Sequence, residues 1–398
     1  VGVLRSMLFF CTCIQSSGYS DQQSFVAFTL QITTFVLSNH SLSAPVLVSD
    51  CCGVLSSLLQ EDGCSRSLMA SPLLLRLLEM HSSDQIELCA PSSIEVVSGR
   101  KDLLRLRKRV LSNFAVAAEM RYRIGIDNQP VVFNAFLERA SATLVSQSVV
   151  SSATFTVFCA DVRALIKGTT TSYFLHKVMQ WLIDLKEPII RVLVALPSLS
   201  WDLVKTWAKM TNMCLSLLTS DLVSPLPTAF CSFVFDSLGF LLDQKAAALG
   251  QGFPLTVEEL NLIARLLEGV LSGTWCNVGV MAHYGDTNVQ RALHTVISKF
   301  VHADASEVMS LVKHRDCFFT AISGCFSVES ATQAFRQDPG FADTSFRLAA
   351  FLVQCLKRSP LPSLIEAINV VFGEKTVVWQ AGAHPFVVNL FGERSEEH

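Results

Sequence analysis

The chain has 398 residues, half of them hydrophobic and 16% charged, where about 25% is usual, and its formal net charge is −3. A net charge so close to zero gives no overall attraction to nucleic acid or to anionic lipid. Charges interrupt the longest apolar runs, for example Arg191, Asp236 and Arg347. This pattern favours helices with one buried face over membrane spans, so we expect no membrane insertion.

Taken in chain order, nearly every apolar segment has a helical period rather than the alternation of a strand. We expect helices over 2–14, 21–38, 44–60, 66–80, 99–123, 129–147, 152–167, 172–186, 188–196, 200–219, 227–249, 256–272, 286–302, 305–324, 328–337, 342–358 and 363–373. Two helices with their Pro/Gly/Ser-rich loops take about 40 residues, the length of a HEAT or armadillo unit. The pattern predicts an all-α fold, an α-solenoid of HEAT-like antiparallel helix pairs. A globular multi-helix bundle is the alternative.

The predicted array extends over 1–373, and we expect 374–398 to form a C-terminal segment and a solvated tail. Weak strand patterns occur at 376–379 and 386–391. Because the chain begins with Val1 inside an apolar run, we interpret it as a piece of a longer array.

Two of the predicted helices begin with capping signals. Thr256 and Glu259 have the spacing of a capping box, in which each side chain accepts a hydrogen bond from the other residue's backbone N–H. Ser363 and Glu366 repeat this spacing, and Gly373 is placed to end that helix. We therefore expect Glu259 to act in capping and not in acid–base catalysis.

No sequence motif points to catalysis or to a cofactor. There is no Gly-rich phosphate loop, His-Glu-x-x-His, Gly-x-Ser-x-Gly or calcium loop. The 13 cysteines are odd in number and form no Cys-x-x-Cys pair, so neither a disulfide framework nor a zinc site is indicated. We expect buried, reduced thiols in a cytosolic or nuclear protein that is not an enzyme and holds no cofactor or metal.

One predicted helix carries a cluster of positive charge: Arg100, Lys101, Arg105, Arg107, Lys108 and Arg109, followed by Arg121 and Arg123. Helical spacing puts Lys101, Arg105 and Lys108 on one stripe, and turns inward the apolar positions Leu103, Leu106, Val110, Phe114 and Ala117. One interpretation of Arg100, Lys101, Arg105 and Lys108 is a solvated outer face. The other is a surface for an acidic protein partner, because guanidinium groups pair bidentately with carboxylates. Nucleic acid is less favoured, since no aromatic residues interleave with these charges.

The most specific pattern lies at 272–301. Gly273 is placed to end one helix and Asp286 to cap the next, which has an apolar stripe at Val289, Ala292, Leu293, Val296, Ile297, Phe300 and Val301. The motif reads Gly-x-(aromatic)-x-Asn-x-Gly-Val-x-x-x-Tyr-Gly-Asp, with Gly273, Asn277, Gly279, Tyr284, Gly285 and Asp286 at its defined positions. It resembles a stretch of the exportin-7 branch of nuclear transport receptors, within the importin-β superfamily.

The resemblance implies both a fold and a function. Such receptors are stacks of HEAT units that wrap protein cargo together with Ran in its GTP form and contact Phe-Gly nucleoporins. It implies shuttling between nucleus and cytoplasm through the nuclear pore. It also implies a middle to C-terminal fragment, since the family's main Ran-binding region is N-terminal. The motif residues are expected to hold helix pairs together rather than to touch cargo. The alternative is a HEAT or armadillo-type interaction scaffold without Ran coupling.

Overall fold

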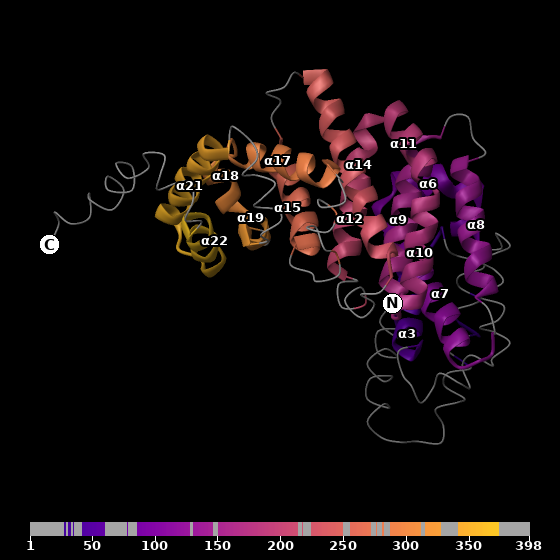
Figure 1. The fold of residues 1–398 in the computed structure, drawn as a ribbon. Coiled ribbons are helices and arrows are strands. Elements are labelled where there is room, and N and C mark those ends of the chain that lie inside the picture. The colour runs from indigo at the N-terminus through magenta and orange to yellow at the C-terminus, as the bar shows by residue number, and fades with distance from the viewer. Residues whose placement is uncertain are drawn as a thin grey trace, which may run out of the picture. The chain divides into compact units, whose positions relative to one another are not determined.

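The computed structural model describes residues 42–59, 86–127, 130–145, 150–213, 224–249, 255–271, 287–311, 315–327 and 341–373, with a few isolated positions besides. Every regular element in these ranges is helical (Figure 1), and the predicted all-α class is confirmed for them. The chain divides into two compact units, Val1–Thr206 (unit 1) and Trp207–His398 (unit 2). The boundary falls inside helix α12 (Ser200–Met213).

Unit 1 is built around helix α7, which packs between α3 and α9; α9 also contacts α6. Gly168, the last residue of α9, lies so close to α7 that a Cβ atom there would stand 2.7 Å from the Cβ of Ala115. Fully buried phenylalanines such as Phe114, Phe133 and Phe155 fill the core. The elements are α3 (Pro45–Leu59), the 3-10 turns η1 (Glu87–Cys89) and η2 (Pro91–Ser93), α6 (Ile94–Gly99), α7 (Lys101–Arg123), α8 (Val131–Val145), α9 (Ser152–Gly168), α10 (Ser172–Asp184), α11 (Lys186–Ala195), η3 (Pro197–Leu199) and the start of α12.

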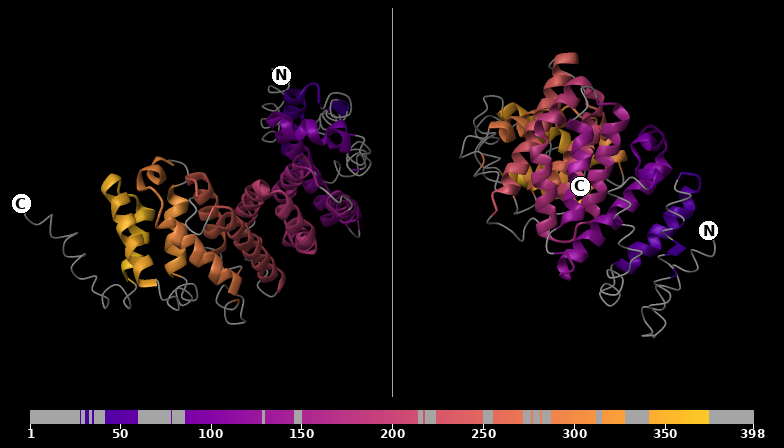
Figure 2. Two further views of the ribbon diagram at one scale, coloured as in Figure 1. Left: turned by 90° about the horizontal axis from the view of Figure 1, so that it is seen from above. Right: turned by 90° about the vertical axis from the view of Figure 1, so that its right-hand side faces the viewer.

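In unit 2, helices that alternate along the chain lie side by side. Helix α15 contacts α19 and α19 contacts α22, while α14 contacts α17 and α17 contacts α21, as the orange and yellow part of Figure 2 shows. Trp207 is fully buried, with ring centroids 5.4 Å from those of Phe230 and of Phe233. The elements are α14 (Leu226–Leu249), α15 (Val257–Leu271), α17 (Thr287–Phe300), α18 (Ala305–Ser310), α19 (Arg315–Ser327), α21 (Phe341–Arg358) and α22 (Pro362–Gly373).

Most predicted helices in the described ranges are present, and α9 and α14 match their predictions to one residue. The continuous helix predicted over 305–324 is wrong, because the backbone leaves the helical region at Leu311 (φ −75°, ψ 63°) between α18 and α19. The elements η1, η2, α6 and η3 are not among the predicted helices. The predictions over 2–14, 328–337, 376–379, 386–391 and 374–398, and most of 21–38 and 66–80, lie outside the described residues.

One predicted capping box is confirmed and the other is wrong. Thr256 N–H donates to Glu259 Oε2 at 2.9 Å, and Glu259 N–H donates to Thr256 Oγ1 at 3.3 Å. Ser363 instead lies one residue inside α22, and its hydroxyl donates to Asp316 Oδ1 of α19 at 2.7 Å. A residue already inside the helix cannot serve as its N-cap, so this hydroxyl joins two helices. Helix α22 is described as far as Gly373, where the sequence predicts its end, and the end itself stays a prediction because the next residues lie outside the described ones.

Helix α14 is, among the described residues, the one helix long and apolar enough by length and composition to cross a membrane. However, 61% of its most apolar stretch is buried inside the protein. Phe230, Val234 and Leu238 have no exposed surface. This burial is what the core helix of a globular unit requires, and the absence of membrane insertion stays a prediction.

Candidate functional site

The apolar face of α7 lies where the sequence places it. The five positions predicted to face inward are all buried: Leu103, Leu106, Val110, Phe114 and Ala117. The helical period therefore fixes the rotation of α7 about its axis, and with it the side of the helix on which each basic residue lies.

The four residues proposed as a protein-binding surface lie toward solvent. Arg100 forms a two-bond ion pair with Asp102, at 3.2 and 2.6 Å, and both side chains are about half exposed (49% and 46%). The hydrogen bond from Arg100 lowers the pKa of the Asp102 carboxyl. Lys101 and Arg105 are exposed and form no ion pair with a described residue, while Lys108 is half-buried. Lys101 and Arg105 thus present positive charge that the described residues do not neutralise.

Two other basic residues of the cluster do not belong to the outer face, which corrects the interpretation of the whole cluster as solvated. Arg107 is only 7% exposed because it lies four residues after Leu103 and three before Val110, on the buried side. Its Nε and Nη2 atoms donate to the two carboxylate oxygens of Asp161 on α9, each at 2.8 Å, and its Nη1 atom donates to the carbonyl of Leu88, also at 2.8 Å. The buried guanidinium is thereby paired.

Arg121 is the second buried cation, 8% exposed, near the C-terminal end of α7. It donates to both carboxylate oxygens of Asp127, at 2.7 and 2.8 Å. The chain can return to meet it because Gly125 takes a left-handed conformation (φ 74°), and Ile126 N–H donates to the carbonyl of Arg121. Hydrogen bonds of this kind end many helices, and here they fold the next residues back onto α7.

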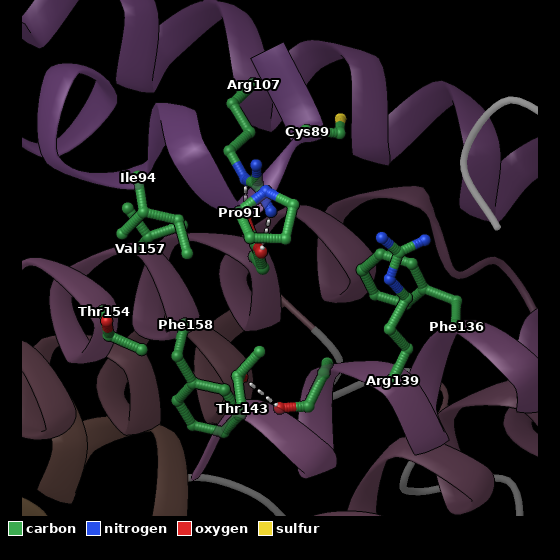
Figure 3. Close-up of a pocket in the computed structure, with 12 residues that line it drawn as sticks. Cys89, Pro91, Ile94, Arg107, Phe136, Arg139, Thr143, Thr154, Val157 and Phe158 are labelled. Carbon is green, nitrogen blue, oxygen red and sulfur yellow. Dashed lines mark hydrogen bonds and ion pairs between the residues drawn. The ribbon is translucent and has the colours of Figure 1, made fainter. Parts of the chain in front are cut away.

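A small cavity of about 60 Å³ lies beside the Arg107–Asp161 pair (Figure 3). Figure 3 shows Arg107 reaching into it from α7, with Phe136 and Arg139 together on another side. Its walls come from the 89–94 segment, α7, α8 and α9. Sites that enclose drug-sized ligands have about 300 Å³ or more, so this cavity has room for a few water molecules or one short side chain.

Burial and the ion pair act in opposite directions on the charged groups at this cavity. Burial is the largest single effect and would by itself lower the pKa of Arg107, but the negative charge of Asp161, the neighbouring Cys89 and the hydrogen bonds that Asp161 accepts together raise the pKa. Burial raises the pKa of the nearby Cys89 thiol to about 11, against the opposing effect of Arg107. Arg107 therefore stays charged and Cys89 stays neutral near neutral pH, so the cavity offers no thiolate nucleophile.

The cysteines in the described ranges behave as small hydrophobic residues, as predicted. All those in the described part of the chain are free, and most are buried. Burial raises the pKa of Cys159, Cys325 and Cys355 to about 12. The described residues contain no group of three or more His, Cys, Asp or Glu side chains that could hold a metal ion.

The motif residues Gly273, Asn277, Gly279, Tyr284, Gly285 and Asp286 lie outside the described residues. Two positions between them are described: Cys276 and Met281 are buried, and the Cys276 Sγ–H donates to Met281 Sδ at 3.4 Å. The helix before the motif, α15, ends at Leu271, and the predicted apolar stripe of α17 is buried at Ala292, Leu293, Val296, Ile297 and Phe300. The helices on both sides of the motif are therefore where the sequence predicts them.

The polar contacts that hold α7 in place are not predicted by the sequence pattern. Arg109 Nη1 donates to the Ser49 hydroxyl at 2.6 Å, and Asn113 Nδ2 donates to the carbonyl of Cys52 at 2.8 Å, both on α3. A polar residue on the apolar side of α7, such as Asn113, is the feature of the sequence that could have indicated these contacts.

In comparisons with known proteins, no protein-family model matches the chain and no curated protein matches it significantly.

Proposed function

We propose that the protein is an exportin-type nuclear transport receptor, an array of HEAT-like helix pairs that binds protein cargo together with Ran-GTP and Phe-Gly nucleoporins. It would work by binding, without catalysis, and would shuttle between nucleus and cytoplasm. The structural observation that supports the array is the packing of alternate helices within each unit.

This packing supports a repeat array over a closed bundle. In unit 2 one set of contacts runs from α15 to α19 to α22, and a second runs from α14 to α17 to α21. In unit 1 the contacts run from α3 to α7 to α9. An array in which each helix pair packs on its neighbours has this pattern, and it presents an extended surface to a partner.

The transport role rests on the resemblance at 272–301. The burial of Cys276 and Met281 supports a packing role for this segment, because residues that hold helix pairs together are removed from solvent. Cargo or Ran would then bind elsewhere. The exposed charges of Lys101 and Arg105 on α7 supply one surface that fits an acidic partner.

The test compares the two nucleotide states of Ran. The protein, expressed from its complete reading frame, is immobilised and incubated with nuclear extract and purified Ran loaded with a non-hydrolysable GTP analogue or with GDP. We expect specific proteins, identified by mass spectrometry, to be retained with the GTP form and lost with the GDP form. Binding is linked reciprocally, so the retained cargo should also tighten Ran-GTP binding.

Equal recovery in both states would refute the exportin proposal. It would favour the alternative, a HEAT or armadillo-type scaffold without Ran coupling. A Lys101→Glu/Arg105→Glu variant tests the α7 surface in the same assay: loss of the acidic partners, with helical content unchanged in circular dichroism, would assign them to α7.

A further inference from the structure

The cavity of about 60 Å³ in unit 1 is lined by one face of α8 and one face of α9. The α8 face carries Phe136, Arg139 and Ala140, and the α9 face carries Val157, Phe158 and Asp161. Within each set the intervals are three and four residues, so helical spacing puts its members on one side of their helix. Figure 3 shows Arg107 entering the same space from α7. Two guanidinium groups and one carboxylate therefore line the cavity.

The aromatic walls of the cavity are held in place from behind. Phe136 packs against Phe114 of α7 with 5.3 Å between ring centroids, and Phe158 packs against Trp181 of α10 at 5.5 Å. The indole N–H of Trp181 donates to the Ser141 hydroxyl of α8 at 2.6 Å, which ties α10 to α8. The cavity is thus formed before any ligand arrives, so binding there orders few side chains and loses little conformational entropy.

Arg107 has hydrogen-bond donors left for a ligand. A guanidinium group has five N–H donors, one on Nε and two on each terminal nitrogen. Nε and Nη2 each donate once to the Asp161 carboxylate, and Nη1 donates once to the Leu88 carbonyl. One N–H on Nη1 and one on Nη2 therefore have no acceptor among the described residues. Because Arg107 is only 7% exposed, these two donors lie in the protein interior, where an N–H without an acceptor is unfavourable.

Acceptors at the same cavity already receive hydrogen bonds. Each carboxylate oxygen of Asp161 accepts one from Arg107 at 2.8 Å. The hydroxyl of Thr143, which also lines the cavity, donates to the Ala140 carbonyl at 2.7 Å, the second dashed contact in Figure 3. The two donors of Arg107 are what the described lining leaves unmatched. This balance favours a ligand that accepts hydrogen bonds over one that donates them.

The charge of the lining residues favours an anion. Arg107 and Arg139 are positive and Asp161 is negative, while the Cys89 thiol, whose pKa burial raises to about 11, is neutral near neutral pH. The lining residues therefore carry one positive charge in excess. Burial lowers the pKa of Arg139, because its charged form is partly withdrawn from water. A negative charge in the cavity would compensate for that loss of hydration.

The size and shape of the cavity select among anions. A water molecule needs at least about 10–15 Å³ of cavity volume, so about 60 Å³ holds an ion of roughly four non-hydrogen atoms. A carboxylate accepts two parallel hydrogen bonds from a guanidinium group, and the apolar Val157 and Phe158 suit the methyl group of acetate. A single excess positive charge also matches a monovalent carboxylate better than divalent sulfate or phosphate.

We propose that this cavity binds a small free carboxylate ion of the size of acetate. The carboxylate accepts the two remaining N–H groups of Arg107, its charge lies beside Arg139, and its alkyl end lies against Val157 and Phe158. The Arg107 guanidinium then stands between the ligand and Asp161, which keeps the two negative charges apart. The inference goes beyond the transport proposal and is independent of it, since neither Ran nor the 272–301 motif enters the argument.

The test titrates sodium acetate into the full chain at constant ionic strength and follows saturation transfer from the protein to the acetate methyl group by NMR. Ligands of four atoms bind weakly, so we expect a dissociation constant of about 0.1–10 mM. The Arg139→Met variant, which leaves Arg107 and Asp161 in place, should bind about tenfold more weakly, because a charged donor beside the ligand is lost. Acetamide, which has nearly the same shape and no charge, should not bind.

The matched control is Arg191→Met, the same substitution at an exposed position of α11, which should leave the affinity unchanged. Ala140→Leu should abolish binding by filling the cavity, and circular dichroism checks that each variant is folded. If Ala140→Leu misfolds, Arg139→Met and the comparison of acetate with acetamide decide. Absence of acetate binding would assign the cavity to water molecules and overturn the proposal. So would equal affinity in Arg139→Met, equal binding of acetamide, or sulfate that binds more tightly than acetate and displaces it.

Discussion

Removing the carboxylate of Asp161 should destabilise unit 1 strongly. In the Asp161→Ala variant, the Arg107 guanidinium, 7% exposed, would lose two hydrogen bonds of 2.8 Å and keep the one to the Leu88 carbonyl. Breaking a buried ion pair from one side typically costs about 3–5 kcal/mol, because a charge is left in a poorly polarisable interior. We expect a loss of this size in the free energy of unfolding.

Replacing both members should restore most of the stability. In Arg107→Met/Asp161→Leu no buried charge remains, and the Leu88 carbonyl keeps a share of the Ser93 hydroxyl proton, at 3.2 Å, which that hydroxyl also donates to the Ala90 carbonyl at 2.7 Å. The adjacent cavity of about 60 Å³ gives room for the larger leucine. Apolar replacement of a buried pair is often neutral or stabilising, so we expect the double variant within about 1 kcal/mol of the original protein.

The assay is urea unfolding followed by circular dichroism, with hydrogen exchange of peptides from α7 and α9 to localise the change. The control is Arg100→Ala/Asp102→Ala, which removes a two-bond pair whose side chains are about half exposed. Pairs in solvent contribute little, so this control should leave stability unchanged within error. If Asp161→Ala is no more destabilised than the control, or if the double variant is as unstable as Asp161→Ala, the reasoning about the buried charge is wrong.

Two further predictions concern helix packing and buried thiols. Gly168→Ala should lower the free energy of unfolding by about 1–3 kcal/mol, because its new methyl group would stand 2.7 Å from the Ala115 Cβ on α7. The control Gly99→Ala places its methyl group where nothing lies within 4 Å and should not destabilise the protein. Equal unfolding midpoints of the two variants in urea would contradict this. Stability should fall in alkali, because the pKa of a buried thiol is higher in the folded chain, at about 11 for Cys89 and about 12 for Cys325, than the ordinary 9.0. The stabilisation is therefore complete below about pH 9 and is lost as the pH rises through these folded values. Unfolding measured against pH should show a smaller alkaline loss in Cys325→Ala, and an identical pH profile would count against the assignment.

The elements that the sequence predicted correctly are those set by neighbours in the chain. The apolar stripe of α7 and the capping box of Thr256 and Glu259 depend on residues within one or a few helical turns. The helical period and the reach of a side chain to a nearby backbone group are fixed by local geometry, so they can be read without the fold. The outward positions of Lys101 and Arg105 follow from the same period.

What only the tertiary structure decided depends on residues far apart in the chain. In the sequence Arg107 is one member of a basic cluster. Its role differs from that of the others because the fold brings Asp161, 54 residues later in the chain, beside it. Tyr122 and Tyr173 likewise meet only because α10 begins at the end of α7, where Glu119 holds Thr170. A charge can be buried in the core only when a partner from a distant part of the chain pairs with it, and a stacked pair of rings likewise needs both segments to be brought together. The helices and their faces are therefore properties of the sequence, whereas the paired charges and the stacked tyrosines are properties of the packing.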